Sequence, residues 1–402
     1  MAQPWDVIVI GVGSMGASAC YQLARRGASV LGLEQMDTAP HELGAHHGHS
    51  RMFRLSYFEH ADYVPLLRRA FDGWRELEQA SGQRLMYTTG GVWAGRPDDP
   101  LVAGSLDAAR RHGLEHEALS RPQLAERYPQ LMIADDWSGL FEPKAGLIVP
   151  ERAVSACVRL AEEHGARIIT GQAVTDVAED GALMRVATSD AAYSAKHVVF
   201  TAGAWTRDIG VPLTVTRQVM GWVRPVHPDR LTPDALPCVA LATAPGSVHY
   251  GFPLIAPSGP SDPTDADAPA LDDPGVPPPG LFKFAHHYQG PTTTPHTVDR
   301  QPKPDDADDF LPALQRFLPD AAGEVADVRI CLYANSPDGH FIIDRHPRYA
   351  PGKTTLACGF SGHGFKFVSV MGEVIADLAL DGRTDQPIGF LGLSRFGNTD
   401  RA

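Results

Sequence analysis

The segment Asp6-Val-Ile-Val-Ile-Gly-Val-Gly-Ser-Met-Gly16 decides the fold of this chain. Residues 7–10 form a continuous β-branched run, which is typical of a strand buried on both faces. Residues 17–26 have helix-forming composition with an apolar face, and residues 28–33 favour a second strand that ends at Glu34. Strand, glycine turn, helix, strand and acidic residue in this order predict a βαβ unit that binds a dinucleotide.

Each glycine of the turn has its own expected task. Gly11 permits the tight turn, Gly13 lets the backbone approach a pyrophosphate, and Gly16 lets the helix pack on the strand. Free N–H groups and the helix dipole favour phosphate at the helix N-terminus. Glu34 is placed to accept hydrogen bonds from an adenosine ribose. The chain holds 39 glycines, so the hexamer alone could be an ordinary turn, and the elements around it favour the nucleotide interpretation.

Composition excludes several classes of protein. A chain of 402 residues with 43% hydrophobic residues predicts two or three domains. Its net charge of −13 disfavours nucleic-acid binding, and no apolar run approaches the ~18 residues of a membrane span. The first residues lack a basic n-region and a cleavage site, so no secretory signal is expected, and five widely spaced cysteines are typical of cytosolic thiols. We therefore expect a soluble cytoplasmic enzyme.

The rest of the chain does not continue as a doubly wound sheet. Helical patterns cover residues 63–80 and 104–130, with a strand-like stretch at 90–94 between them. A second βα-type stretch runs over 151–203, and a strand, glycine turn and helix follow over 354–380. Pieces of a nucleotide domain are thus interleaved with a second domain. This argues against a nicotinamide dehydrogenase, whose Rossmann domain usually runs as one unbroken alternation.

Five sequence elements together resemble one family. They are Gly11-Val-Gly-Ser-Met-Gly16, His46-His-Gly-His-Ser-Arg-Met-Phe-Arg54, Tyr250-Gly-Phe-Pro253, Cys331-Leu-Tyr333 with Asn335-Ser-Pro-Asp338, and Gly359-Phe-Ser-Gly-His-Gly-Phe-Lys-Phe367. The family is the monomeric sarcosine oxidase and N-methyl-tryptophan oxidase group of FAD amine oxidases, and the similarity runs from about residue 6 to Arg395. The resemblance implies an enzyme that oxidises N-methyl amino acids by hydride transfer to FAD. Reoxidation by O2 would give hydrogen peroxide, and hydrolysis of the imine would give an aldehyde and the demethylated amino acid.

The resemblance also implies the domain organisation. We expect an α/β fold in which a Rossmann-type FAD-binding domain is interleaved with a mixed-sheet α+β substrate domain. The expected FAD-binding pieces are 1–85, 151–217 and 328–402, and the expected substrate-domain pieces are 86–150 and 218–327. Residues 257–280 hold eight prolines and five aspartates, so they are expected to be an exposed loop. Relative to the family this segment resembles an insertion of roughly twenty residues.

Cys331 matches the family cysteine that carries FAD as an 8α-S-cysteinyl link. A thiolate near an electrophilic flavin methyl can form a thioether. Without the family match, the favoured interpretation of Cys331 is a small buried hydrophobe in a strand over 328–333.

Two cations are expected to bind the substrate carboxylate. Arg54 and Lys366 match the family's carboxylate clamp, and a guanidinium fork plus an ammonium suits that task. Arg51 matches an arginine that lies against the flavin. On composition alone, Arg51 and Arg54 could equally form a solvated basic patch.

Lys283 matches the lysine that promotes oxygen reduction, since a fixed cation stabilises the anion formed when O2 accepts an electron. Its alternative is an ordinary surface lysine, because the inserted loop just before it makes its alignment less certain. His287 matches the family's active-site histidine, with His286 as its competitor. Lys283, Arg51 and His287 are therefore the expected catalytic residues.

The expected pocket residues are aromatic. Tyr250, Phe252 and Tyr333 would line the substrate site, although aromatics on strands are more often core. The helix expected over 365–380 would point its positive N-terminus at the flavin. His49 replaces a family acid, and a metal site at the neighbouring histidines lacks a convincing partner set, so none is expected.

The residues expected to bind the cofactor are Gly11, Gly13, Ser14, Met15, Gly16, Glu34, Ser50, Arg51, Val174, Gly203, Trp205, Cys331, Gly359, Gly362, His363, Gly364, Phe365 and Lys366.

Alternative functions remain open from sequence. An oxidase of N-methyl-tryptophan, of cyclic imino acids or of another bulky amine would share these motifs. A flavin dehydrogenase with a protein or quinone acceptor would not need Lys283, and a non-catalytic FAD module would not need the clamp. The expected partners are an amino-acid substrate and O2, with no nucleic acid and no membrane, and the family makes a monomer the default.

Overall fold

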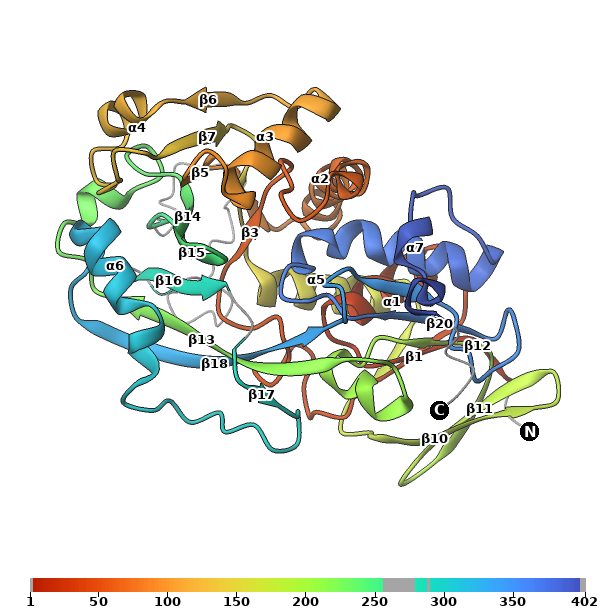
Figure 1. The fold of residues 1–402 in the computed structure, drawn as a ribbon. Coiled ribbons are helices and arrows are strands. Elements are labelled where there is room, and N and C mark those ends of the chain that lie inside the picture. The colour runs from red at the N-terminus through yellow and green to blue at the C-terminus, as the bar shows by residue number, and fades with distance from the viewer. Residues whose placement is uncertain (1–2, 256–277, 279, 288–289, 398–402) are drawn as a thin grey trace.

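A computed structural model describes residues 3–255, 278, 280–287 and 290–397 of the chain (Figure 1). The inserted loop expected at 257–280 lies almost wholly outside the described residues.

The first sheet is built around the N-terminal strand. Its order is β10-β11-β12-β1-β2-β9, with β20 beside β12 and β19 beside β20. The pairs β1–β2, β1–β12, β2–β9 and β12–β20 are parallel, as in a dinucleotide-binding sheet. The strands are β1 (Trp5–Ile10), β2 (Val30–Leu33), β9 (Arg167–Ile169), β10 (Val174–Asp180), β11 (Leu183–Thr188), β12 (Ala192–Phe200), β19 (Ile342–Asp344) and β20 (Thr354–Cys358).

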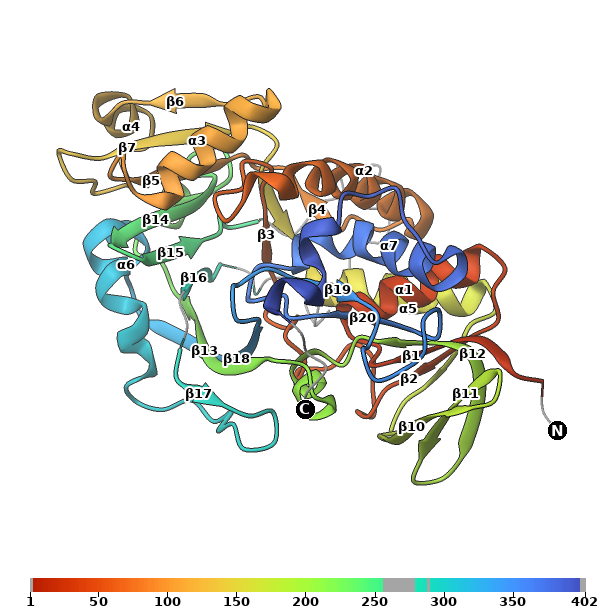
Figure 2. The same ribbon diagram turned by 45° about the vertical axis from the view of Figure 1, so that its right-hand side comes forward.

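A group of helices packs beside this sheet. α1 (Ser14–Arg25) contacts α5 (Pro150–Glu163) and α7 (Val368–Asp381), and α7 contacts α2 (Val64–Ser81). Figures 1 and 2 both show these helices gathered on one side of the β1–β12–β20 region. Segments from both ends of the chain thereby build one nucleotide-type layer.

A second, mixed sheet fills the other half of the molecule. Its order is β17-β13-β16-β15-β14-β5-β7-β6, and β18 pairs with β13. The strands are β5 (Gly91–Gly95), β6 (Glu117–Leu119), β7 (Ser138–Glu142), β13 (Thr214–Val223), β14 (Cys238–Ala244), β15 (Ser247–Gly251), β16 (Phe282–His287), β17 (Thr292–Thr293) and β18 (Val325–Asn335). Its helices are α3 (Pro100–His112), α4 (Arg121–Arg127) and α6 (Leu311–Phe317).

A small third sheet joins the two halves. It has the order β3-β8-β4 and consists of β3 (Arg51–Phe53), β8 (Gly146–Ile148) and β4 (Met86–Tyr87). The remaining short 3₁₀ turns are η1 (Ala61–Tyr63), η2 (Gly203–Ile209), η3 (Pro228–Leu231), η4 (Asp306–Asp309), η5 (Pro319–Ala321), η6 (Phe365–Phe367), η7 (Gly389–Leu391) and η8 (Leu393–Phe396).

Two expectations from sequence differ from this architecture. The helical pattern over 104–130 is interrupted, because Gly113 ends α3 in the left-handed region at φ 57° and β6 follows before α4 begins. Residues 328–335, assigned from sequence to the FAD-binding pieces, lie in β18, which pairs along β13 in the second sheet. A strand's partner across a sheet is not encoded in its own alternation of residues.

Among the described residues, no helix combines the length and the apolar character that crossing a lipid bilayer requires.

Candidate active site

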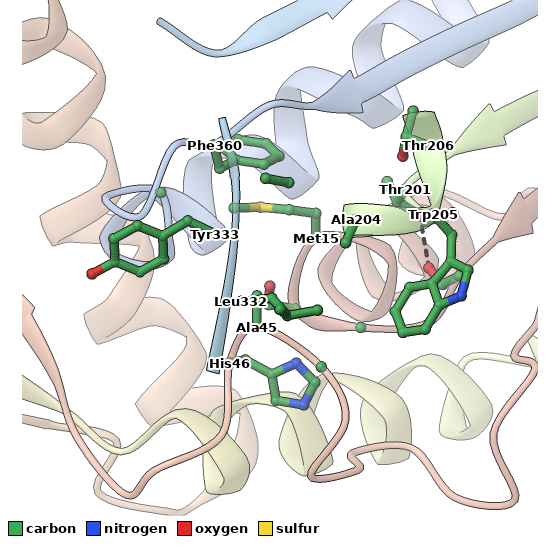
Figure 3. A pocket seen from close by; sticks show the side chains of 18 of the residues that line it. Met15, Ala45, His46, Thr201, Ala204, Trp205, Thr206, Leu332, Tyr333 and Phe360 are labelled. Atoms are coloured by element: carbon green, nitrogen blue, oxygen red, sulfur yellow. Dashed lines mark hydrogen bonds between the residues drawn. The ribbon is translucent and has the colours of Figure 1, made fainter. Parts of the chain in front are cut away.

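A cavity of about 700 Å³ runs between the glycine turn of the first sheet and the strands of the second. Side chains and backbone from far-apart segments reach its wall, and Figure 3 shows Met15, His46, Trp205, Tyr333 and Phe360 around it. A volume of this size is within the range that small-molecule and cofactor sites occupy.

The glycine turn has the geometry that close backbone approach demands. Gly11 has φ 88°, and a Cβ on it would lie 2.9 Å from the Cα of Ala202. A Cβ on Gly16 would lie 1.9 Å from the carbonyl oxygen of Gly11, so α1 packs directly on the turn. The N–H groups of the first turn of α1 have no acceptor inside the helix, and Gly13 lies beside them in the cavity wall. This end of the cavity suits a phosphate group.

Glu34 also lies in the cavity wall. Its carboxylate accepts the N–H of Val12 at 2.8 Å and that of Met36 at 3.1 Å. The carboxylate is thereby fixed at the end of β2, facing the cavity, where ribose hydroxyls of a dinucleotide would lie.

Arg51 and Cys331 meet at one carbonyl group. The Arg51 guanidinium donates to the carbonyl oxygens of His47 at 2.6 Å, Ala45 at 3.1 Å and Ser50 at 2.8 Å. The Cys331 thiol lies 3.7 Å from the same oxygen of Ala45. Both side chains line the cavity, so the thiol and a fixed cation stand next to each other there.

Lys283 is buried and lies behind the cavity wall. Its ammonium donates to the carbonyl oxygens of Gly48 at 2.7 Å and Ser50 at 2.9 Å. Burial, together with the nearby Arg51, lowers the pKa of Lys283 well below its usual value. The Nζ atom lies 5.3 Å from the ring centres of both Trp222 and Phe252.

Arg54, which also lies in the cavity wall, carries its own counter-ion. Its guanidinium binds both carboxylate oxygens of Glu59, at 2.5 and 2.6 Å, and both residues line the cavity. Burial acts to raise the pKa of Glu59, but Arg54, His363 and Lys366 together outweigh it and bring that pKa to about 2.

Lys366 and Arg54 both lie against the ring of Tyr57. The Lys366 ammonium donates to the carbonyl oxygen of His363 at 2.8 Å and lies 5.1 Å from the ring centre of Tyr57. The Arg54 guanidinium lies 4.5 Å from the same ring. Burial, with Arg54 as the next cause, lowers the pKa of Lys366 to about 7.

The ring of Tyr57 is itself held in place. His363 Nε2 lies 3.0 Å from the carbonyl oxygen of Gly339, which requires a proton on Nε2. His363 Nδ1 then accepts a hydrogen bond from the Tyr57 hydroxyl. The loop that carries Lys366 is thus tied to the segment that carries Arg54.

The structure separates the two competing histidines. His287 lines the cavity, with Nδ1 3.1 Å from the hydroxyl oxygen of Tyr333, and burial lowers its pKa to about 4. His286 points to the other face of β16, where it stacks on His249 with ring centres 4.1 Å apart. Successive side chains of a strand alternate between faces, so only His287 is placed for the site.

Most of the residues expected from sequence come together at the cavity. Those in its wall are Gly11, Gly13, Ser14, Met15, Glu34, Arg51, Arg54, Val174, Gly203, Trp205, Tyr250, His287, Cys331, Tyr333, Gly359, Gly362, His363, Gly364, Phe365 and Lys366. Gly16, Ser50, Lys283 and Phe252 are not in the wall.

The expectation that Phe252 lines the substrate pocket differs from its position in the structure. Its ring packs edge-on against Tyr250 at 5.7 Å and on the Lys283 ammonium, inside a cluster with Leu147 and Val149. Tyr250 ends in the wall instead, and Phe252 supports it from behind.

Sequence reasoning missed three polar groups, Glu59, Tyr57 and Glu151. Glu59 and Tyr57 follow the Arg54 motif closely, and a search for a counter-ion beside the clamp could have found Glu59. Glu151 accepts the N–H of Gly48 at 2.6 Å from more than a hundred positions away, which no local pattern signals. No group of three or more His, Cys, Asp or Glu side chains in the described part of the chain is arranged to hold a metal ion.

A βαβ unit whose glycine turn faces a cavity between two sheets is the arrangement of a dinucleotide-binding protein. Residues 6–378 match the family described as FAD dependent oxidoreductase. The chain is 41% identical to the monomeric sarcosine oxidase of Streptomyces avermitilis, over 97% of each protein. It is 32% identical to the N-methyl-L-tryptophan oxidase of Escherichia coli K12, over 98% of this chain and 99% of that protein.

Solved structures agree in fold. NikD, an amino acid oxidase essential for nikkomycin biosynthesis, matches with a TM-score of 0.79 and 23% identity over 97% of this chain and 98% of that one. Glycine oxidase from Geobacillus kaustophilus matches with a TM-score of 0.75 and 19% identity, over 98% of this chain and 99% of that one. The chain belongs to the FAD-dependent oxidoreductases, and its predicted family and fold class are confirmed.

The cavity fits FAD. The uncovered N–H groups at α1, the fixed carboxylate of Glu34 and the absence of a side chain at Gly13 suit its diphosphate and ribose. Cys331 and Arg51 lie in the same wall and could contact the ring system of a bound flavin.

Proposed function

We propose that this chain is an oxidase of N-methyl amino acids that uses FAD and O2. The observation that carries the proposal is the pair of cations, Arg54 and Lys366, in the same cavity wall as Cys331 and the glycine turn. Bound FAD supplies the acceptor for two electrons from the substrate and passes them on to O2. Sarcosine oxidase and N-methyl-L-tryptophan oxidase, the names of the similar proteins, indicate the substrate class.

The residues of the chain bind and orient the substrate. Arg54 and Lys366 receive its carboxylate, which fixes the direction of the N-methyl group in the cavity. Tyr250, Tyr333 and His287 also line the cavity, and in this proposal they enclose the amine of the substrate. The lowered pKa of His287 keeps its imidazole neutral at pH 7, so it can accept a proton there.

The reaction consumes one amine, one O2 and one water. The carbon–nitrogen bond of the substrate is oxidised to an imine, and hydrolysis releases an aldehyde and the demethylated amino acid, while O2 is reduced to H2O2. Lys283 is the proposed cation for the oxygen step, acting from behind the cavity wall. We propose N-methyl-L-tryptophan or a cyclic imino acid as the second candidate substrate, on the name of the Escherichia coli relative.

Peroxide release tests the proposal. Purified holoenzyme is supplied with sarcosine, N-methyl-tryptophan, proline and pipecolate, and the flavin absorbance is followed under nitrogen. Bleaching followed by peroxide on admission of air supports the oxidase. Bleaching without peroxide, with turnover only on an added dye acceptor, would show a dehydrogenase, and no bleaching with any of these amines contradicts the proposal.

We also propose that Cys331 carries FAD covalently. Its thiol lies in the cavity wall beside the Arg51 guanidinium, and the other four cysteines of the chain are also free and buried. Acid-precipitated enzyme should remain yellow, Cys331→Ala should release the colour, and Cys238→Ala in the second sheet should behave as the unsubstituted enzyme. Free flavin in the supernatant of the unsubstituted enzyme would contradict the link.

We further propose a cytoplasmic monomer that needs no partner besides substrate and O2. The name of its Streptomyces relative supports the monomer, and five buried free thiols suit a reducing compartment. Light scattering of the holoenzyme should give one chain per particle.

A further inference from the structure

The peptide group between Gly48 and His49 is hydrogen-bonded to a cation on one side and to an anion on the other. The carbonyl oxygen of Gly48 accepts a hydrogen bond from Lys283 Nζ at 2.7 Å. The N–H of His49, which belongs to the same peptide group, donates to Glu151 Oε1 at 3.0 Å. The N–H of Gly48 donates to that oxygen at 2.6 Å, and Lys283 also donates to Ser50 O at 2.9 Å.

The backbone conformation of this segment allows both hydrogen bonds to form. Gly48 and His49 have φ angles of 105° and 65°, so two successive residues stand in the left-handed region. Successive N–H groups in such a turn can point to one side and accept an anion there. A Cβ on Gly48 would lie 2.9 Å from Met220 Cε and 3.5 Å from Lys283 Nζ, so the end of Met220 would have to shift, and the positive φ of Gly48 would strain any other residue there.

Glu151 reaches the turn from the start of α5. It lies in the first turn of that helix, where the helix dipole favours a negative charge. Its second oxygen, Oε2, is buried and has no hydrogen-bond partner. The carboxylate therefore makes its hydrogen bonds through one oxygen, to the same segment that accepts the hydrogen bonds of Lys283.

The charged groups around Lys283 act on its pKa in opposite directions. Burial lowers the pKa of Lys283, and Arg51 and Arg329 lower it further. Glu151 and Cys331 act in the opposite direction. Burial in turn raises the pKa of Glu151, so both groups depend on partners to stay charged.

We propose that Glu151 is a positioning residue for Lys283, holding its ammonium charged and in place through the peptide group between Gly48 and His49. A peptide whose N–H is bound to an anion has a more negative carbonyl oxygen, so the hydrogen bond from Lys283 is strengthened. The effect of Glu151 on the reaction rests on the proposed role of Lys283 in the oxygen step.

The Glu151→Gln substitution tests this inference, because the amide keeps an acceptor oxygen for both N–H groups while it removes the negative charge. Stopped-flow measurement of the holoenzyme separates reduction by substrate under nitrogen from reoxidation by O2. Reduction should stay within twofold, and reoxidation should slow about tenfold, as expected for one lost charged interaction. The alkaline limb of the reoxidation rate should move to lower pH, and Glu151→Asp should restore part of the rate. Glu163→Gln, an exposed position at the end of α5 paired with Arg159, is the matched control.

A double-mutant cycle shows whether the effect passes through Lys283. In the Lys283→Met background, Glu151→Gln should change reoxidation by less than twofold. An equal slowing in both backgrounds would overturn the inference. Normal reoxidation in Glu151→Gln, with slow reoxidation in Lys283→Met, would also overturn it while leaving the oxygen role of Lys283 intact.

A direct titration keeps the inference testable if Lys283 has no role in the oxygen step. The chain has six lysines, so the Nζ signal of Lys283 in ¹⁵N-lysine-labelled holoenzyme can be assigned by its loss in Lys283→Met. Glu151→Gln should lower the pH at which this signal titrates. An unchanged titration refutes the inference, whereas normal reoxidation in Lys283→Met refutes only the proposed oxygen role.

Discussion

Two groups of Lys, Arg and Glu lie along the cavity and use the same residue types differently. The Lys283 trio consists of Lys283, Arg51 and Glu151, and the Lys366 trio consists of Lys366, Arg54 and Glu59. In the Lys283 trio, cations and carboxylate are joined only through backbone peptide groups. In the Lys366 trio, Arg54 and Glu59 touch directly at 2.5 Å in the cavity wall.

The difference shows how a fold can give one cation permanent hydrogen-bond partners and another cation a partner that a ligand can replace. Lys283 lies behind the wall, and its two hydrogen-bond acceptors are backbone carbonyl oxygens of the Gly48 turn, so a ligand in the cavity does not compete for it. Arg54 is held by a side-chain carboxylate, which a substrate carboxylate can replace with similar geometry. A fixed charge suits stabilisation of a developing anion, and an exchangeable one suits substrate binding.

The sharpest test of this contrast is Lys283→Met. A fixed cation that acts on an anion formed from O2 should be dispensable for reduction by substrate, so reduction under nitrogen should proceed at close to the normal rate. Reoxidation should slow by about two to three orders of magnitude in stopped flow. The exposed Lys303→Met is the control. Slow reduction with fast reoxidation would instead make Lys283 a substrate residue, and no change in either would make its role purely structural.

Substitutions in the Lys366 trio should affect reduction of the enzyme by substrate rather than its reoxidation. Arg54→Met and Lys366→Met should each remove one of the proposed charged hydrogen bonds to the substrate carboxylate, at a cost of about 1.5–3 kcal/mol, or roughly ten- to a hundredfold in kcat/KM. Assays on the amino acid and on its methyl ester separate this loss from general damage, and reoxidation should be unaffected. An equal loss on the ester would rule out the clamp.

The pH dependence of binding should distinguish the two lysines further. The pKa of Lys366 is lowered to about 7, so its ammonium is charged below that pH and is lost as pH rises through it. The KM for the amino acid should therefore increase by about tenfold between pH 6 and 8, and the KM for the methyl ester should stay flat. A flat profile for both substrates would mean that Lys366 does not contact the carboxylate.

The smallest expected effect is that of Glu59→Gln. Removing the carboxylate frees Arg54 for the substrate, so KM for the amino acid should fall by about two- to threefold at pH 6, where Lys366 is charged. Glu76→Gln, whose carboxylate pairs with Arg69 on α2, is the matched control. An increase in KM at pH 6 would show that Glu59 orients Arg54 rather than competing for it.

Much of the nucleotide half could be predicted from sequence because its signals are local. The β-branched run of β1, the glycine spacing of 11–16 and Glu34 at the end of β2 follow one another within one βαβ unit. The segments around Arg51 and Lys366 are similarly short and distinctive, and both residues lie in the cavity wall. The helical pattern over 104–130 failed because a single glycine ended the helix where composition alone favoured its continuation.

The arrangement of charges depended on tertiary structure. Sequence by itself determined the dinucleotide unit, the enzyme family and the residue types available to the site. Only the folded chain decided that Lys283 stands behind the wall, that Phe252 supports Tyr250, and that Glu151 reaches the Gly48 turn. The reason is physical: a local pattern determines which face of its own element a side chain occupies, whereas a buried ion's partner is set by which distant element packs opposite.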